Sequence, residues 1–209
     1  MLSISNADSA DVGNRILGAA ASCVRDFGVE RVTLAEIARR AGVSRPTVYR
    51  RWPDTRTILA SLLTERVVGA WNESQNESRT NPGAVDPTPE GLRRALVRRI
   101  VGVARRLRED DLILTVLRAA PELAMVYIAD RLGTSQQVMI DVLAEELRKA
   151  QHDNSVRCGD PRRLAATVLL ITQSVVQSGQ IVAPILDAGE LDVELSHALN
   201  GYLAGSPDD

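Results

Sequence analysis

The sequence predicts an all-α protein, and three observations support this fold class. Aromatic residues make up only 3% of the 209 residues, and hydrophobic residues make up 44%. A core with so few rings is filled by aliphatic side chains, which pack most easily as helix on helix. Apolar residues recur at helical spacing, and no stretch alternates apolar and polar residues over the length of a strand. With 25% charged residues, the composition is that of a soluble globular protein.

The first expected helix covers residues 9–27 and ends at Gly28, because glycine commonly terminates helices. Its apolar face carries Val12, Ile16, Ala20, Val24 and Phe27. Two short helices follow. Thr33 and Glu36 have the spacing of a capping box at the start of the first, which ends at Gly42. Ser44 caps the second and Pro46 lies in its first turn, where a missing N–H is tolerated. Two short helices joined by such a turn predict a helix-turn-helix.

The net charge of −2 conceals an uneven distribution. Between residues 31 and 56, seven arginines face only two acids, which leaves this segment at +5 and the remainder of the chain net acidic. Guanidinium groups suit two-pronged contacts with phosphate or guanine. A helix pair whose arginines merely face solvent would share part of this pattern. The two caps, the tight turn and the local charge favour DNA binding.

The second short helix is expected to enter the major groove with its N-terminal residues at the base edges. Hydroxyl and guanidinium groups supply phosphate and base contacts, and the proline and the threonine methyl group can touch a thymine methyl. The candidate DNA-binding residues are Thr33, Ser44, Arg45, Pro46, Thr47, Tyr49, Arg50, Arg51 and Arg56.

Six further helices are expected beyond this motif, which makes about nine in all. Two of them begin with a cap followed by proline, at Thr88-Pro89 and at Asp160-Pro161. The expected ranges are 54–76, 89–108, 111–119, 121–151 with a break at Gly133, 161–178 and 191–203.

The helix at 89–108 carries seven arginines and no acid between residues 91 and 108. Its leucines and valines share one sector, so the pattern is typical of an amphipathic helix with a solvated face. The expected partners of the arginines are Glu109, Asp110 and Asp111. An acidic effector, flanking DNA or a protein surface is the alternative.

The helix at 161–178 is apolar on two faces, one with Leu164, Val168, Ile171 and Val175 and the other with Ala165, Leu169 and Val176. Such a helix is buried on both sides, either at the centre of a monomer or between its own body and a partner chain.

Other classes of site find little support in the sequence. Cys23 and Cys158 are too few for a disulfide framework or a zinc site, so we expect two reduced thiols. His152 and His197 have no metal-ligand spacing, and no phosphate loop or nucleophile motif occurs, so neither an enzyme nor a metal or other cofactor is expected. Apolar runs such as 168–171 are far shorter than the roughly 20 residues of a spanning helix, and no signal peptide is recognisable, so the cytoplasm is expected.

Residues 12–62 resemble the DNA-binding domain of the TetR family of transcriptional regulators. The resemblance rests on the run Ile37 to Ser44 (IARRAGVS) and the run Pro46 to Pro53 (PTVYRRWP). It implies a three-helix DNA-binding domain over 1–56, an effector-binding and dimerisation domain over 57–209, and a homodimeric repressor that leaves a palindromic operator when a small molecule binds. The family often has a phosphate-contacting Lys where this chain has Thr55, and Arg56 next to it is a substitute.

The resemblance also implies where the effector and the partner chain bind. The effector would be a small, largely apolar molecule, near Trp71, Arg118, Met125, Tyr127 and Met139, although core packing explains each of these residues equally well. The dimer interface would hold Leu164, Val168, Ile171, Val175, Leu195, Ala198 and Tyr202. The alternative function is a helical binding or interaction protein whose basic domain contacts acidic surfaces without reading sequence, and a helical enzyme ranks below it.

Overall fold

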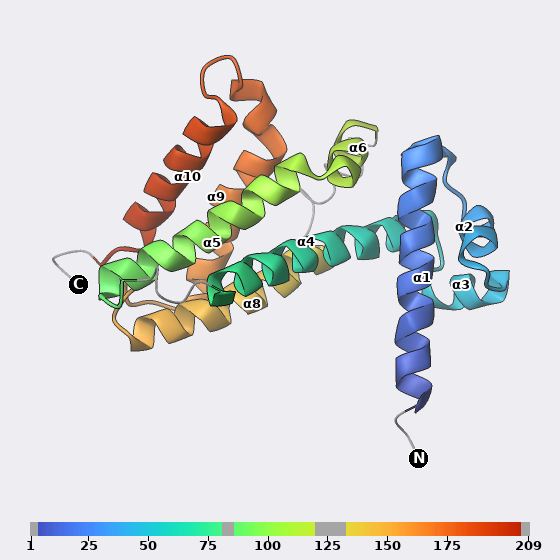
Figure 1. Cartoon of the computed structure of the whole chain (residues 1–209), viewed down its shortest axis with the longest axis horizontal. Coiled ribbons are helices and arrows are strands. Elements are labelled where there is room, and N and C mark those ends of the chain that lie inside the picture. The colour runs from blue at the N-terminus through green and yellow to red at the C-terminus, as the bar shows by residue number, and fades with distance from the viewer. Residues whose placement is uncertain (1–3, 81–85, 120–132, 206–209) are drawn as a thin grey trace. The chain divides into compact units, whose positions relative to one another are not determined.

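The computed structural model describes residues 4–80, 86–119 and 133–205 (Figure 1). Within these ranges the chain forms nine α-helices and two short 3₁₀ helices, and it has no strand, so the predicted all-α class is confirmed. The α-helices are α1 (Ile4–Phe27), α2 (Leu34–Ala41), α3 (Arg45–Arg51), α4 (Thr55–Thr80), α5 (Pro89–Glu109), α6 (Asp111–Ala119), α8 (Thr134–His152), α9 (Pro161–Ser178) and α10 (Ala188–Leu203); the 3₁₀ helices are η1 (Val29–Arg31) and η4 (Gly179–Val182).

The chain divides into two compact units. The head unit comprises Met1–Glu65 together with Asp110–Thr134, and the body unit comprises Arg66–Glu109 together with Ser135–Asp209. Helix α4 runs through the boundary, as its expected length indicated. Helix α6 follows α5 in the chain but joins the head unit, because its Leu112 and Val116 are buried in the same cluster as α1, α2 and α3.

The core of the head unit is aliphatic, as the composition predicted. Its fully buried large side chains include Ile16, Val24, Ile37, Val48, Ile58 and Leu62. Phe27 departs from the prediction that it lies on the buried face of α1, since its side chain is 38% exposed. Its ring is covered on one side by the guanidinium of Arg40 instead.

Caps account for the ends of most helices of the body unit. Asp160 accepts hydrogen bonds from the backbone N–H groups of Arg162 and Arg163, which confirms the expected start of α9. Helix α10 begins three residues before its expected start, because Asp187 and Glu190 form a complete capping box. Gly133 precedes the first residue of α8, where a break was expected; the expected start of that helix at residue 121 lies outside the described residues.

Helix α9 has one face in the core of the body unit and another on its surface. Leu164 and Val168 are buried with Leu195 of α10, whereas Leu170 is 65% exposed. Side chains that are already buried have no surface to offer a partner chain, so these three predicted interface residues belong to the core. Of the other four, Ile171, Val175 and Tyr202 are half-buried and Ala198 is exposed.

Residues 161–182 are long and apolar enough to cross a membrane, with a mean hydropathy of 1.3. Length and composition do not distinguish such a segment from a core helix of a helical bundle. Within the structure 17% of that window is buried, including Leu164 and Val168, which pack in the core of the body unit.

Three arginines of α5 pair with acids of other helices and one pairs within α5; the ion pairs found among the described residues do not use the expected partners Glu109, Asp110 and Asp111. Arg99 pairs with Glu146 of α8, and Arg108 pairs with Asp192 of α10. Arg106 pairs with Glu73 and Glu77 of α4, and Arg94 pairs with Glu90 within α5. Asp110 has another role, because it accepts hydrogen bonds from the first backbone N–H groups of α6. This arginine face therefore ties α5 to its neighbours.

Candidate nucleic-acid interface

Helix α2 begins and ends as its sequence predicts, with one difference at its start. The Thr33 hydroxyl accepts a hydrogen bond from the Glu36 backbone N–H at 3.2 Å, which is one half of the expected capping box. The Glu36 carboxylate does not complete the box among the contacts of the described residues; it accepts hydrogen bonds from Arg39 and Arg40 instead. Local spacing predicted the cap and missed the competition for this carboxylate.

The turn between α2 and α3 depends on Gly42. This residue has φ 63° and ψ 35°, a left-handed conformation that glycine adopts without steric cost. Its backbone N–H donates to the Arg39 carbonyl, and the Val43 N–H donates to the Ala38 carbonyl, so two of the last four carbonyls of α2 are satisfied. The chain then reaches the cap of α3 within two residues.

Helix α3 presents its polar side chains to solvent. The Ser44 hydroxyl accepts from the Thr47 backbone N–H at 3.3 Å and lies 2.8 Å from the Thr47 hydroxyl. Tyr49 is 50% exposed, and Val48 on the opposite face is fully buried. The exposed residues of this helix and its cap are Ser44, Arg45, Pro46, Tyr49 and Arg50, with Thr47 half-buried. Five of the candidate DNA contacts therefore lie open on one short helix and its cap.

Arg51 is placed differently from the other candidates. It is half-buried, and its Nη1 atom lies so close to α1 that a Cβ added to Gly13 would be 2.9 Å away. The Arg51 guanidinium therefore lies beside α1, unlike the open side chains of Arg45 and Arg50.

The end of α3 is anchored to α4 by Trp52. Its indole N–H donates to the Ser61 hydroxyl at 2.8 Å, and the Ser61 hydroxyl donates to the Thr57 carbonyl. Asp54 caps α4, because its carboxylate accepts from the backbone N–H and the hydroxyl of Thr57. These hydrogen bonds lower the pKa of Asp54. Arg56 is exposed in the first turn of α4, next to Thr55.

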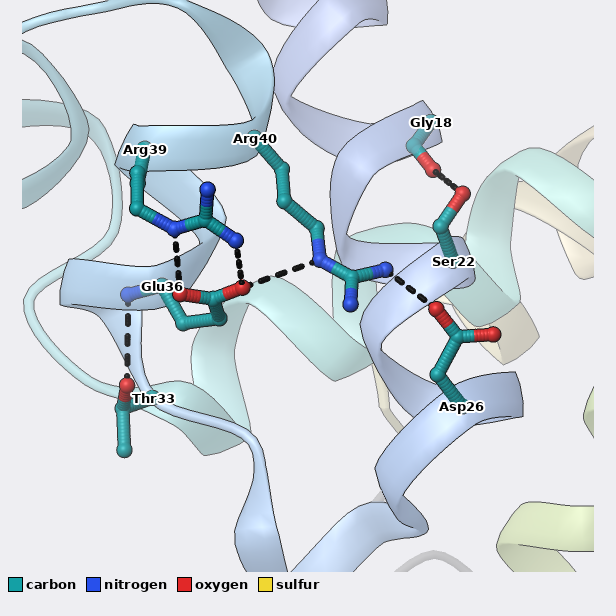
Figure 2. Close-up of polar contacts among 7 residues, drawn as sticks. All are labelled: Gly18, Ser22, Asp26, Thr33, Glu36, Arg39 and Arg40. Atoms are coloured by element: carbon teal, nitrogen blue, oxygen red, sulfur yellow. Dashed lines mark hydrogen bonds and ion pairs between the residues drawn. The ribbon is translucent and has the colours of Figure 1, made fainter.

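Two arginines of the basic segment are held by carboxylates of the head unit itself (Figure 2). Arg40 donates from Nη1 to Asp26 at 2.5 Å and from Nε to Glu36 at 3.0 Å, and its guanidinium carbon lies 4.6 Å from the centre of the Phe27 ring. Arg39 donates from Nε to Oε2 of Glu36 and from Nη2 to Oε1, the oxygen that also accepts from Arg40. These bonds lower the pKa of Glu36 to about 2.

The sequence contained part of this cluster. Glu36 precedes Arg39 by three residues and Arg40 by four, which is the spacing of ion pairs on one helix. The partnership of Arg40 with Asp26 spans 14 residues and carries no local signal. The charge that is available to a polyanion is therefore smaller than the sequence count of +5 indicates.

The predicted effector residues do not come together as one group in the structure. Trp71 and Met139 are buried in the core of the body unit, and the Arg99 guanidinium lies 4.2 Å from the Trp71 ring centre. Arg118 is exposed on α6 and belongs to the head unit. Met125 and Tyr127 lie outside the described residues.

Comparison with known proteins places this motif in a family. Residues 16–62 match the family model of bacterial regulatory proteins of the tetR family. The chain is 60% identical over 203 residues to the uncharacterised HTH-type transcriptional regulator Rv2250c of Mycobacterium tuberculosis, which covers 97% of this chain and 100% of that protein.

Solved structures agree on the fold. The TetR-family transcriptional repressor QsdR of Rhodococcus erythropolis superimposes with a TM-score of 0.64 at 18% identity, over 91% of this chain and 94% of that one. RolR in complex with resorcinol superimposes with a TM-score of 0.64 at 14% identity, over 97% and 92% of the two chains. The family model matches the capped, arginine-bearing helix-turn-helix, and a 60% identical helix-turn-helix regulator aligns with 97% of the chain, so the chain belongs to the TetR family of bacterial helix-turn-helix transcriptional regulators.

Proposed function

We propose that this chain is a cytoplasmic repressor that binds a palindromic operator as a homodimer and leaves it when a small, largely apolar molecule binds the body unit. The observation that carries the proposal is the exposed, capped recognition helix α3, which is held on the buried Val48 and Trp52. QsdR, a repressor of the same fold, supports repression rather than activation. The family is not a class of enzymes, which supports a binding function.

The DNA contacts divide by chemistry. Arg45, at the start of α3, is placed for a base edge, and Tyr49 offers a hydroxyl one turn further along the exposed face. Arg50 and Arg56 are exposed cations suited to phosphates. Thr33, Ser44, Pro46 and Thr47 complete the proposed set around the ends of α2 and α3.

Selection of bound fragments from genomic DNA tests this proposal. A sequence-reading repressor enriches a few fragments that share an inverted repeat, because two copies related by a twofold axis read two half-sites. If random DNA of the same length competes as well as the selected fragments, the basic head unit binds acidic surfaces without reading sequence and the proposal is wrong.

The homodimer is proposed to form through the outer faces of α9 and α10. Leu170 and Val193 are 65% and 52% exposed, and large apolar side chains on a helical surface gain stability from burial against a partner. Ala198 is also exposed on α10. The other predicted interface residues Leu164, Val168 and Leu195 lie in the core of the body unit, on the inner faces of the same two helices.

Leu170→Glu should convert a dimer to a monomer in sedimentation experiments at micromolar concentration. Arg98→Ala is the matched control, since it makes the same change in net charge on the exposed face of α5. A Leu170→Glu protein that sediments as the parent does would remove α9 from the interface.

The effector is proposed to bind within the helices of the body unit. Trp71 and Met139 come from α4 and α8 and lie in one apolar cluster, which suits a molecule with few polar groups. RolR, a protein of the same fold, binds resorcinol in its solved complex. In a Trp52→Phe protein, Trp71 is the remaining tryptophan, so a change in its emission reports binding in the body unit. A compound that releases the operator without changing this emission would contradict a site beside Trp71.

A further inference from the structure

We propose that Asp26 and Glu36, two carboxylates beside the helix-turn-helix, strengthen DNA recognition because they hold α2 against α1 through Arg40. They act as positioning residues, although their own charge repels DNA. The inference rests on DNA binding by the head unit, which the proposed function also requires.

The Arg40 guanidinium has three partners, and Figure 2 shows the two carboxylates among them. One nitrogen donates to Asp26 of α1, another donates to Glu36 of α2, and the planar face covers the ring of Phe27 at the end of α1. Its side chain is 22% exposed, compared with 71% for Arg39. An arginine with this many internal partners fixes the contact between two helices and has little freedom to reach a phosphate.

The position of α3 depends on the position of α2. Helix α3 has only seven residues, and its one buried residue is Val48, which lies in the same cluster as Ile37 of α2. The turn at Gly42 that connects the two helices is short, and its backbone N–H groups are hydrogen-bonded to carbonyls of α2. A shift of α2 on α1 is therefore passed to the side chains of α3, and base contacts tolerate small displacements poorly.

Electrostatic repulsion and positioning predict opposite changes in DNA affinity when one of these carboxylates is neutralised. Removal of a negative charge near a polyanion should tighten binding, because fewer repulsive charges face the phosphates. Under the proposal, Asp26→Asn and Glu36→Gln weaken binding to a selected genomic fragment by about two- to fivefold, the range for the loss of a half-exposed charge-assisted contact. Binding to random DNA should change little.

The matched control is Glu30→Gln, which removes an exposed carboxylate of the same unit in η1. Its affinity for the selected fragment should stay equal or rise. The proposal is overturned if Asp26→Asn and Glu36→Gln bind the fragment as tightly as the parent or more tightly.

Arg40→Met separates positioning from direct contact. A lost phosphate contact lowers the slope of log affinity against log salt by about 1. A positioning residue lowers affinity, here by about tenfold, and leaves this slope unchanged. A reduced slope would make Arg40 a phosphate contact and overturn the proposal.

Two further measurements keep the comparison interpretable. Asp26→Glu keeps the carboxylate and should recover most of the affinity that Asp26→Asn loses, and a failure to recover would count against the ion pair. Trp52 emission in a Trp71→Phe background shows that each head unit is folded at the assay temperature. Failure of the parent protein to enrich any fragment would refute the proposed function, whereas a wrong order among the variants would refute only this inference.

Discussion

The turn at Gly42 provides the most quantitative prediction. A Cβ added to this residue would meet nothing within 4 Å, so Gly42→Ala introduces no clash with its surroundings. The left-handed backbone, at φ 63°, remains the only source of strain. It costs an L-residue about 1–2 kcal/mol, and alanine recovers about 0.4–1 kcal/mol by restricting the unfolded chain. The net destabilisation of the head unit should lie between roughly 0 and 1.6 kcal/mol, with a midpoint of about 0.8 kcal/mol.

The matched control is the same chemical change on α1. Gly18 lies inside a helix, is exposed, and also has nothing within 4 Å of an added Cβ. Because its backbone is helical, Gly18→Ala should stabilise the head unit by about 0.5–1 kcal/mol. One substitution at two open positions of one unit should therefore change stability in opposite directions.

Urea unfolding with Trp52 emission measures both variants. The Trp71→Phe background leaves Trp52 as the remaining tryptophan, and its indole is 8% exposed in the head core. The free energy of unfolding should fall for Gly42→Ala and rise for Gly18→Ala, with unchanged dependence on urea. Equal effects of the two substitutions would refute the assignment of the cost to the backbone conformation at Gly42.

Three further predictions follow from the head and body units. The folded-state pKa of Glu36, about 2, lies below its usual value of 4.5. The contribution of Glu36 to the stability of the head unit is therefore present above pH 4.5 and is lost as the pH falls toward 2. This loss of stability, measured by Trp52 emission, should disappear in Glu36→Gln and persist in Glu30→Gln. Arg45→Ala should reduce the binding free energy for the selected fragment by about 1–3 kcal/mol and change binding to random DNA little. Arg56→Ala should weaken binding to both DNAs and reduce the slope of log affinity against log salt by about 1, and an interchange of the two results would reverse the roles assigned to the two arginines. Leu199→Ala should destabilise the body unit by about 2–5 kcal/mol, because the side chain is fully buried, and Trp71 emission should detect the loss; an effect below about 1 kcal/mol would contradict this core.

Local signals predicted the helices well because helix formation and capping act over a few residues. The caps of α2, α3 and α9 at Thr33, Ser44 and Asp160 are all present. Helix α10 begins three residues before its predicted start, because Asp187 and Glu190 form a capping box, and this signal is equally local. The half-formed capping box of α2 has another cause, since arginines of the following turn compete for the Glu36 carboxylate.

Burial was harder to predict than helix boundaries. The two apolar faces of α9 were visible in the sequence, but periodicity does not say which face meets the chain's own core. The structure buries Leu164 and Val168 and leaves Leu170 exposed. Phe27 shows the same limit, because its place on an apolar stripe did not reveal that an arginine covers it.

The sequence by itself determined the helical class, the helix-turn-helix with its caps and the presence of cations on α3, because each depends on residues within about one or two helical turns. Only the tertiary structure decided the partners of the remaining arginines. Arg40 meets Asp26 across 14 residues, and Arg108 meets Asp192 across 84. Such pairs form where packing brings distant helices together, and a carboxylate has no local preference for one arginine among the 24 in this chain.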